Sequence, residues 1–498
     1  MKLSKLTYGV WVILCFVCYS CQKDNTNTDL VTLPSVKIDT TGVQTSFEVQ
    51  QGVNEISIDP KIVSDANTNL TYLWRIYSTT GLSDTLDNKK AFKQVIKKVP
   101  GTYTLEFQAK QNNGLSSFMR YNVKVVKQLE YGWVVAYETP EGATDVGFFR
   151  TPEIVKSISN DFVLTDLYKK ANGAALPGSP VAIAISGNNN YLYSTKEAVG
   201  IYTSDYSKIV SFSQLFGGDP PTPHIQGIFG SGSYQLINNG TVYFMYSNLY
   251  LGEVVVDAKG YQVETGGGIT YTGARSGVFF DVLNKRFIGL GQFSNQGTTF
   301  ANANANARFN LNNLNKRLLY GDQAETGNPF NSKKVTIFEE FDKSKRWLLG
   351  IDFATAATPD MFMIDMAAMP NILDAKYFDI SNLGPATSPI GYYATDNQVY
   401  NYNYSASNNS ILYTRAGFTA PTGEVITAMK LFKDMGSGYT TADTRTNRIL
   451  FIATWNASTN NGKVYLIGVN ATSGDMVTTP MKVVEGFGKI KDMTLKPS

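Results

Sequence analysis

Residues 132–137 read GWVVAY, an apolar and aromatic run with the length of one β-strand. Similar runs recur between Gly, Asn and Asp turns as far as residue 469, and helical periodicity is almost absent between them. They include TVYFMY at 241–246, WLLGI at 347–351 and KVYLIGV at 463–469. Short, even strands over about 370 residues are typical of a β-propeller, whose repeats run roughly 40–50 residues each. The pattern predicts a propeller-like domain of about seven blades over residues 129–498. A large double sandwich is the alternative architecture.

A second all-β pattern precedes this domain. Residues 34–127 contain short alternating strands such as SFEVQ (46–50), TYLWRIY (71–77) and YTLEFQA (103–109), separated by turn residues. This spacing is typical of an immunoglobulin-like sandwich, in which a tryptophan in mid-strand lies in the core. We therefore expect residues 34–127 to form such a sandwich, with Trp74 buried in it.

The first 20 residues have the layout of a secretory signal peptide. Lys2 and Lys5 precede a short apolar run, VWVILCFV at 10–17, which is too short to span a bilayer as a helix. All three cysteines of the chain lie within the first 21 residues. Ser20 puts a small residue before Cys21, whereas Val17 precedes Cys18. We expect processing before Cys21, which then becomes the lipid-bearing first residue and anchors the protein to the membrane.

Composition limits the remaining function classes. Residues 21–33 are polar and predict a flexible tether. Lys and Arg number 44 against 41 Asp and Glu, a net charge of +3, and no basic stripe is present. Nucleic acid is therefore not an expected partner. No second apolar run is long enough for a transmembrane helix.

Three further features of the sequence belong together. The first is Gln22, Lys23 and Asp24, which follow the lipidated cysteine and resemble a surface-export signal. The second is the N-terminal sandwich with Trp74, and the third is the C-terminal region, with GYYATDNQVYNY (391–402), GKVYLIGVNATSGD (462–475) and GFGKIKDMTLK (486–496). Together these features resemble the PKD-like family of Bacteroidota surface lipoproteins, although Arg75-Ile76-Tyr77 follows Trp74 where typical PKD domains continue their motif.

This resemblance implies a place and a role. Similar proteins are encoded beside a TonB-dependent transporter and its lid lipoprotein, in starch-utilisation-like or RagAB-like systems. The expectation is a lipoprotein on the outer face of the outer membrane, which captures a peptide or glycan ligand or scaffolds its capture, without catalysis. A propeller hydrolase or lyase acting on surface glycan or peptide, and an adhesion protein, are the alternatives.

Catalytic and metal signatures are largely missing from the sequence. The one histidine, His224, lies in a proline-rich loop, and no Gly-x-Ser-x-Gly motif is present. Residues 65–69 (DANTN) start like a calcium loop, but Ile76 stands where the bidentate Glu belongs. Four carboxylates near predicted strand ends, Glu339, Glu340, Asp352 and Asp365, show no pairing that glycoside hydrolysis requires. We expect no catalytic residue, no cofactor and no metal site.

Tyrosine is the remaining signal for ligand binding. Tyr residues number 29 and concentrate in the segment 391–413. Tyrosine combines a large apolar face with a hydroxyl group, which suits peptide and sugar ligands. Tyr392 and Tyr393 are therefore candidate ligand contacts, although tyrosine is also a common β-sheet residue and alternation places Tyr400 and Tyr402 on one face of a strand, where core packing is the commoner role.

Overall fold

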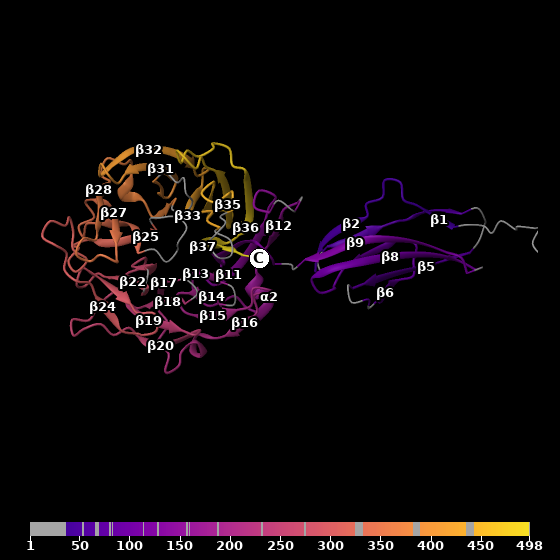
Figure 1. Cartoon of the computed structure of the whole chain (residues 1–498), viewed down its shortest axis with the longest axis horizontal. Helices are drawn as coiled ribbons and strands as arrows, with labels where there is room; N and C mark the ends of the chain where they lie inside the picture. The colour runs from indigo at the N-terminus through magenta and orange to yellow at the C-terminus, as the bar shows by residue number, and fades with distance from the viewer. Residues whose placement is uncertain are drawn as a thin grey trace, which may run out of the picture. The chain divides into compact units, whose positions relative to one another are not determined.

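The structure is a computed structural model. It describes residues 36–51, 54–64, 69–78, 81, 83–112, 114–126, 129–155, 158, 160–186, 189–230, 233–272, 275–323, 332–381, 389–434 and 443–497. The chain divides into two compact units between Gln128 and Leu129. The structure confirms the predicted all-β class, with a sandwich in the first unit and a propeller in the second (Figure 1).

The first unit is a β-sandwich. Its main sheet has the order β2-β9-β8-β5-β6, in which β2 and β9 are parallel, and two-stranded sheets β1-β4 and β3-β7 complete it. The strands are β1 (Val36–Asp39), β2 (Ser46–Gln50), β3 (Glu55–Ile58), β4 (Lys61–Ser64), β5 (Leu70–Tyr77), β6 (Ser83–Asp87), β7 (Phe92–Val95), β8 (Gly101–Gln111) and β9 (Ser116–Val126).

Trp74 forms the centre of the sandwich core, as the sequence predicts. It is fully buried, and its ring lies 4.9 Å from that of Phe92 and 4.7 Å from that of Phe107. Its indole nitrogen donates a hydrogen bond to the Lys89 carbonyl at 3.0 Å, so the buried polar atom is satisfied. Tyr103 donates to the Val99 carbonyl at 2.7 Å and fixes the turn that leads into β8.

The described residues of the second unit form seven four-stranded antiparallel sheets. In order around the unit they are β37 (Lys489–Lys496), β10 (Gly132–Glu138), β11 (Thr144–Arg150) and β12 (Phe162–Leu164); β13 (Pro180–Ser186), β14 (Asn189–Ser194), β15 (Ala198–Ile201) and β16 (Lys208–Val210); β17 (Ile225–Phe229), β18 (Gln235–Asn238), β19 (Thr241–Tyr246) and β20 (Leu249–Glu253); β21 (Gly268–Thr272), β22 (Arg275–Asp281), β23 (Arg286–Leu290) and β24 (Gly297–Thr299); β25 (Arg317–Gln323), β26 (Lys333–Glu339), β27 (Arg346–Asp352) and β28 (Asp360–Asp365); β29 (Tyr377–Ile380), β30 (Ile390–Ala394), β31 (Gln398–Ser405) and β32 (Ser410–Thr419); β33 (Glu424–Leu431), β34 (Ile449–Asn456), β35 (Asn461–Gly468) and β36 (Lys482–Phe487). Short helices are α2 (Leu167–Asn172), η1 (Phe212–Leu215) and η2 (Ile372–Asp374).

The seven sheets close into a ring. The first strand of each sheet contacts the first strand of the next, and β37 contacts both β33 and β13, so the series has no gap. Figure 1 shows the innermost strands, among them β13, β17, β25 and β33, near the centre and β20, β24, β28 and β32 at the rim. This closed arrangement excludes the double sandwich.

The C-terminal strand completes the ring. β37 pairs antiparallel with β10 from Gly132↔Lys496 to Glu138↔Lys489, so the first sheet combines the end of the chain with the beginning of the unit. Gly488 precedes β37 at a point where a Cβ would overlap the Glu138 carbonyl on β10, which explains why the residue has no side chain.

Each interface between neighbouring sheets has its own hydrophobic cluster. Trp133 and Phe451, with ring centroids 3.8 Å apart, belong to the cluster between the first and last sheets, and the other six interfaces are filled in the same way. Alternate residues of each strand therefore face two different clusters, which accounts for the nearly continuous apolar runs in the sequence.

The inner strands all run in one direction through the ring. Each sheet is antiparallel with four strands, so every inner strand starts on the face where the preceding sheet ends. β10 is antiparallel to β37, and the chain therefore enters the second unit at Leu129 on the opposite face, where the inner strands end. We call the two faces the start face and the end face.

Candidate functional site

The residues of the predicted lipid anchor and export signal lie outside the described part of the chain. Cys21, Gln22, Lys23 and Asp24 precede Val36, the first described residue. The calcium-like segment is also outside it, since residues 65–68 are not described. None of the helices in the described part is long and apolar enough to cross a membrane.

Tyr392 and Tyr393 lie in the core rather than at a binding surface. Both belong to β30 and are 1% and 0% exposed. The Tyr393 ring stacks on Tyr400 at 4.8 Å, and its hydroxyl donates to the Pro370 carbonyl at 2.7 Å. Tyr402 is fully buried as well. These side chains fill the interfaces between sheets and offer no ring to a ligand, so the candidate contacts must be sought elsewhere.

His224 and the four candidate carboxylates do not form a shared site among the described residues. His224 is exposed in the loop before β17, and no group of three His, Cys, Asp or Glu side chains there is arranged to hold a metal ion. Among the four carboxylates, Glu339 bonds Arg346, Glu340 bonds Lys316 and Trp347, Asp352 bonds Ser332, and Asp365 bonds Lys345. Each has its own partner, and no two of them line the same cavity described below.

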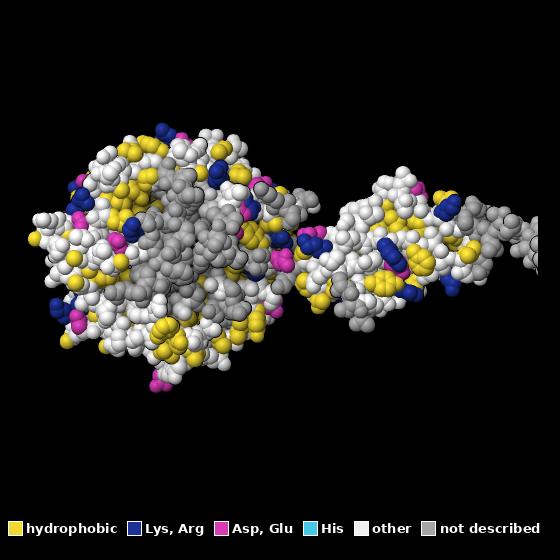
Figure 2. All heavy atoms as spheres, viewed as in Figure 1, with side chains coloured by type: hydrophobic (Ala, Val, Ile, Leu, Met, Phe, Trp, Pro, Cys, Tyr) yellow, Lys and Arg dark blue, Asp and Glu magenta, His cyan; other side chains and the backbone are white. Residues whose placement is uncertain are grey.

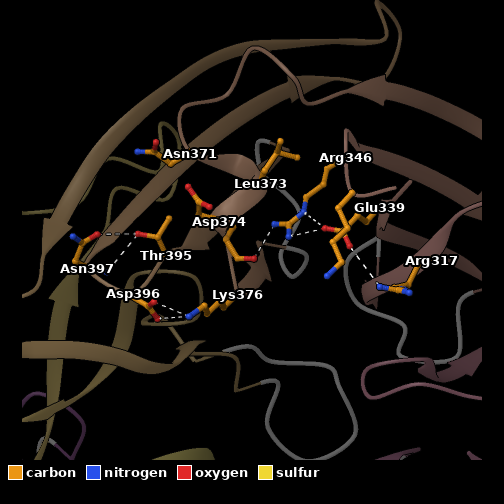
Figure 3. A pocket seen from close by; sticks show the side chains of 12 residues that line it. Arg317, Glu339, Arg346, Asn371, Leu373, Asp374, Lys376, Thr395, Asp396 and Asn397 are labelled. Carbon is orange, nitrogen blue, oxygen red and sulfur yellow. Dashed lines mark hydrogen bonds and ion pairs between the residues drawn. The ribbon is translucent and has the colours of Figure 1, made fainter. Parts of the chain in front are cut away.

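The start face carries a cavity of about 730 Å³ between the sheets β25–β28 and β29–β32, which we call the groove cavity. Its wall consists of polar and charged side chains from the β26–β27 turn, from η2 and the residues around it, and from the β30–β31 turn (Figure 3). The lining residues are Arg317, Glu339, Lys343, Arg346, Asn371, Leu373, Asp374, Ala375, Lys376, Thr395, Asp396 and Asn397. A concave site of this size with convergent polar groups is a candidate for ligand binding.

Arg346 holds two walls of the groove cavity together. Its guanidinium donates to Glu339 Oε1 through Nε at 3.1 Å and through a terminal nitrogen at 3.0 Å. Its other terminal nitrogen donates to the carbonyls of Ile372 and Ala375, which belong to the next sheet's entry loop. Both charged side chains are only 7% exposed. The planar guanidinium can satisfy all these acceptors at once, so it fixes the loop against the turn.

A second ion pair closes the other side of the groove cavity. Lys376 Nζ lies 2.7 Å and 2.6 Å from the two carboxylate oxygens of Asp396, at the end of β30. Figure 3 shows this pair below Thr395 and Asn397, with Asp374 between these residues and Arg346. Thr395 donates to Asn397 Oδ1 at 3.2 Å, which orders the turn. The cavity is thus preformed by ion pairs among its own residues.

Replacing Arg346 with lysine is expected to loosen this wall. Lysine keeps the charge but cannot donate to Glu339 and to both carbonyls at once, so we expect a stability loss of about 1–2 kcal/mol. Hydrogen exchange should become faster in residues 371–376 and unchanged in the sandwich. Arg415→Lys, at an exposed ion pair with Asp475, is the control and should cost under about 0.5 kcal/mol. Unchanged exchange at 371–376 in Arg346→Lys would contradict the assignment.

A second polar network lies in the central channel toward the end face. Lys433, just after β33, reaches Asp322 on β25 at 2.6 Å and Asp379 on β29 at 2.5 Å, and Tyr320 donates to Asp322 at 2.9 Å. Burial by itself lowers the pKa of Lys433, but the two carboxylates outweigh it and hold the pKa above its usual range. The network therefore ties three inner strands together as a set of compensated charges.

The sequence contains a signal for the Arg346 contact that strand patterns alone do not reveal. A carboxylate ends one strand and an arginine followed by an aromatic residue begins the next, at Glu339 and Arg346-Trp347 and again at Asp281 and Arg286-Phe287. Both arginines bond the carboxylate across the turn, with Arg286 Nε 2.9 Å from Asp281 Oδ2. Such repeats could have located the turns on the start face. The partner carbonyls of Arg346 depend on the ring geometry.

One protein family and several solved structures are similar to this chain. Residues 18–180 match the sequence profile of the PKD-like family, which is well under half of the 498 residues. No curated protein matches the sequence. The Dos1 propeller is 11% identical, with a TM-score of 0.41, over 74% of this chain and 88% of that one.

Two further solved structures are similar to this chain. The extracellular domain of a proposed one-component system from B. thetaiotaomicron is 8% identical, with a TM-score of 0.42, over 84% of this chain and 61% of that one. The SGBP-B protein of a Bacteroides ovatus mixed-linkage glucan utilization locus, solved with a mixed-linkage heptasaccharide, is 11% identical, with a TM-score of 0.14, over 93% and 99%. Similarity this distant leaves the function to be argued from the chain's own residues.

Proposed function

We propose that the protein is a non-catalytic lipoprotein on the cell surface that captures a ligand, or scaffolds its capture, for a TonB-dependent importer of the outer membrane. The groove cavity is the observation that carries the ligand-binding part. It is preformed, it lies on the face opposite the one where the chain enters, and its polar groups are held in place by Arg346 and Lys376. Preorganised polar groups reduce the entropy cost of binding.

The partners of two candidate carboxylates support the non-catalytic part of the proposal. A glycosidase needs two carboxyl groups that flank the scissile bond, and one must be free to donate a proton. Glu339 in the groove cavity accepts hydrogen bonds from Arg346 and lies 3.9 Å from an Arg317 nitrogen, so both of its oxygens face guanidinium groups. Glu340, the next residue, faces away and bonds Lys316. Neither is placed to act on a substrate in the cavity.

The importer association rests on the sequence and has a direct test. Tagged protein solubilised from the outer membrane in mild detergent should copurify with a TonB-dependent transporter and its lid lipoprotein, in comparable amounts. Recovery of the protein alone at normal expression would contradict the proposal. The Cys21→Ala variant, which keeps the rest of the signal peptide, serves as the control for association that does not depend on the lipid anchor.

Replacing Cys21 with alanine is expected to abolish lipidation. The acylated cysteine is the membrane attachment, and a two-chain or stronger anchor holds a protein stably at a bilayer, whereas the protein without it is released. Metabolic labelling with a fatty acid should give no labelled protein, and fractionation should find the variant outside the membrane pellet. Cys18→Ala is the matched control and should label normally. Persistent label in Cys21→Ala would disprove the anchor.

A further inference from the structure

The groove cavity has a neighbour on the other side of the same turn. A cavity of about 470 Å³, which we call the tryptophan cavity, is lined by Lys285, Asn315, Glu340, Phe341, Asp342, Ser344, Lys345 and Trp347. At the β26–β27 turn and the strand ends beside it, residues 339, 343 and 346 line the groove cavity, and residues 340–342, 344, 345 and 347 line the tryptophan cavity. The turn therefore lies between the two cavities, and we call this neighbouring pair the double site.

Most charged side chains around this double site are already paired with each other. Arg346 pairs with Glu339, and Arg317 bridges Glu339 and Glu264. Lys376 pairs with Asp396 and Lys345 with Asp365. Lys316 lies 2.7 Å from Glu340. These charges hold the walls in shape and have little to offer a ligand.

One cation and one carboxylate in each cavity have no ion pair among the described residues. In the groove cavity they are Lys343, at the tip of the β26–β27 turn, and Asp374, at the end of η2. In the tryptophan cavity they are Lys285, which donates only to the Asn315 amide, and Asp342, whose carboxylate accepts from the backbone and hydroxyl of Ser344. Each cavity thus offers an uncompensated charge of either sign, on different elements.

The aromatic rings of the site are not free for sugar stacking. Lys316 and Lys345 lie 5.1 Å and 5.0 Å from the centre of the Trp347 ring, and the indole nitrogen donates to Glu340 at 2.7 Å. Lys285 lies 5.2 Å from the centre of the Phe341 ring. Cations over these rings use the faces on which a sugar ring would stack. A neutral glycan would find hydrogen-bonding groups here, but no platform, and would leave four charges unpaired.

We propose that the double site binds peptides that carry both an ammonium and a carboxylate group. In the groove cavity Asp374 takes the ammonium group and Lys343 the carboxylate, and Lys285 and Asp342 do the same for charged side chains further along the peptide. This inference rests on the proposed function, since it names the ligand class of the same site. Charge-assisted hydrogen bonds to groups that have no ion-pair partner among the described residues favour such a ligand over a neutral one.

The test uses one peptide mixture in three chemical forms. A tryptic digest of serum albumin is passed over the immobilised soluble protein untreated, after acetylation of its amines, and after methyl esterification of its carboxyls. Retained peptides are quantified by mass spectrometry, and maltoheptaose and cellohexaose are tested in parallel. We expect untreated peptides to be retained and each modification to lower retention about tenfold, the effect of losing one charged hydrogen bond.

Variants of the groove cavity test whether the peptides are retained there. Asp374→Asn and Lys343→Met should each lower retention of untreated peptides about tenfold, and acetylation should have little further effect in Asp374→Asn. Asp205→Asn and Lys208→Met change the same charges on the exposed β15–β16 turn of another sheet and should retain peptides like the unchanged protein. All variants should keep the unchanged unfolding temperature, because the replaced side chains are exposed.

Each of three results would overturn the inference. The first is equal retention of modified and untreated peptides, the second is no effect of Asp374→Asn and Lys343→Met, and the third is retention of the oligosaccharides alone. If the protein still copurifies with a transporter, any of these results contradicts the peptide as ligand class but not the proposed function. Loss of copurification together with peptide retention would remove the importer role and keep the site.

Discussion

A chain that ends at Gly488 is expected to lose the folded propeller and keep the folded sandwich. The deletion removes β37, which pairs with all seven residues of β10, and it takes Ile490 and Met493 out of the cluster between the first and last sheets. Burying one such side chain contributes about 1.5–3 kcal/mol, so the loss of two, with the backbone pairing, is comparable to the about 5–15 kcal/mol net stability of a domain. The ring would also open along β10.

Calorimetry separates the two units in this experiment. The full chain should show a transition for each unit, since each has its own core, and the shortened chain should keep the sandwich transition alone. Deletion of Ser498 only is the matched control and should leave both transitions in place. A shortened chain that still unfolds with the full enthalpy of the propeller would show that β37 is dispensable.

Replacing Lys433 with methionine is expected to lower the free energy of unfolding substantially. Methionine fits the space but leaves Asp322 and Asp379 as two neighbouring carboxylates without their shared cation, 29% and 7% exposed. Removing one partner of a buried ion pair typically costs 3–5 kcal/mol, and partial exposure of Asp322 argues for the lower end, about 3 kcal/mol. Denaturant unfolding measures the loss. The double variant Lys433→Met, Asp322→Asn should recover part of it, because one of the stranded charges is removed.

The stabilisation from Lys433 has a defined pH window. Its pKa in the folded protein lies above the unfolded value of about 10.4, so folding favours the protonated form. The contribution is therefore complete below about pH 10 and declines as the pH rises through the folded pKa. The stability difference between the unchanged protein and Lys433→Met should be flat from pH 7 to 9 and shrink above about pH 10. A difference that grows at alkaline pH would contradict the network.

Strand periodicity predicts the ring but not its closure. The apolar runs are long enough to identify strands such as β19 and β35, because both of their faces are buried between sheets. The last strand reads KIKDMTLK, with three lysines, and periodicity does not indicate its partner. The structure shows that β37 takes the inner position of the first sheet, next to β10. In the sandwich, short edge strands such as β1 and β7 carry too few apolar residues to be recognised.

The candidate site was less predictable than the fold. Residue type makes Tyr392 and Tyr393 candidates for ligand contacts, but a tyrosine ring can contact a ligand only if it is exposed, and both rings are buried. Both faces of their strand are buried, and in such a strand the period-two alternation of the sequence does not show which side chains reach solvent. The double site gathers turn residues from separate sheets, between Lys285 and Asn397 in the sequence. A charged side chain of this site is unpaired only because the charged residues near it form ion pairs with one another, and those pairs depend on the three-dimensional structure.

The entry of the chain through β10 has a mechanical consequence. Cargo held on the start face and a chain held at Leu129 on the end face would stretch the propeller along the direction in which β10 runs. β10 is bonded along its length to β37 on one side and to β11 on the other. Tension along its axis loads these hydrogen bonds together, in shear, and does not peel them one at a time. Resistance to force is a matter of unfolding rate rather than of equilibrium stability, and this geometry slows that rate.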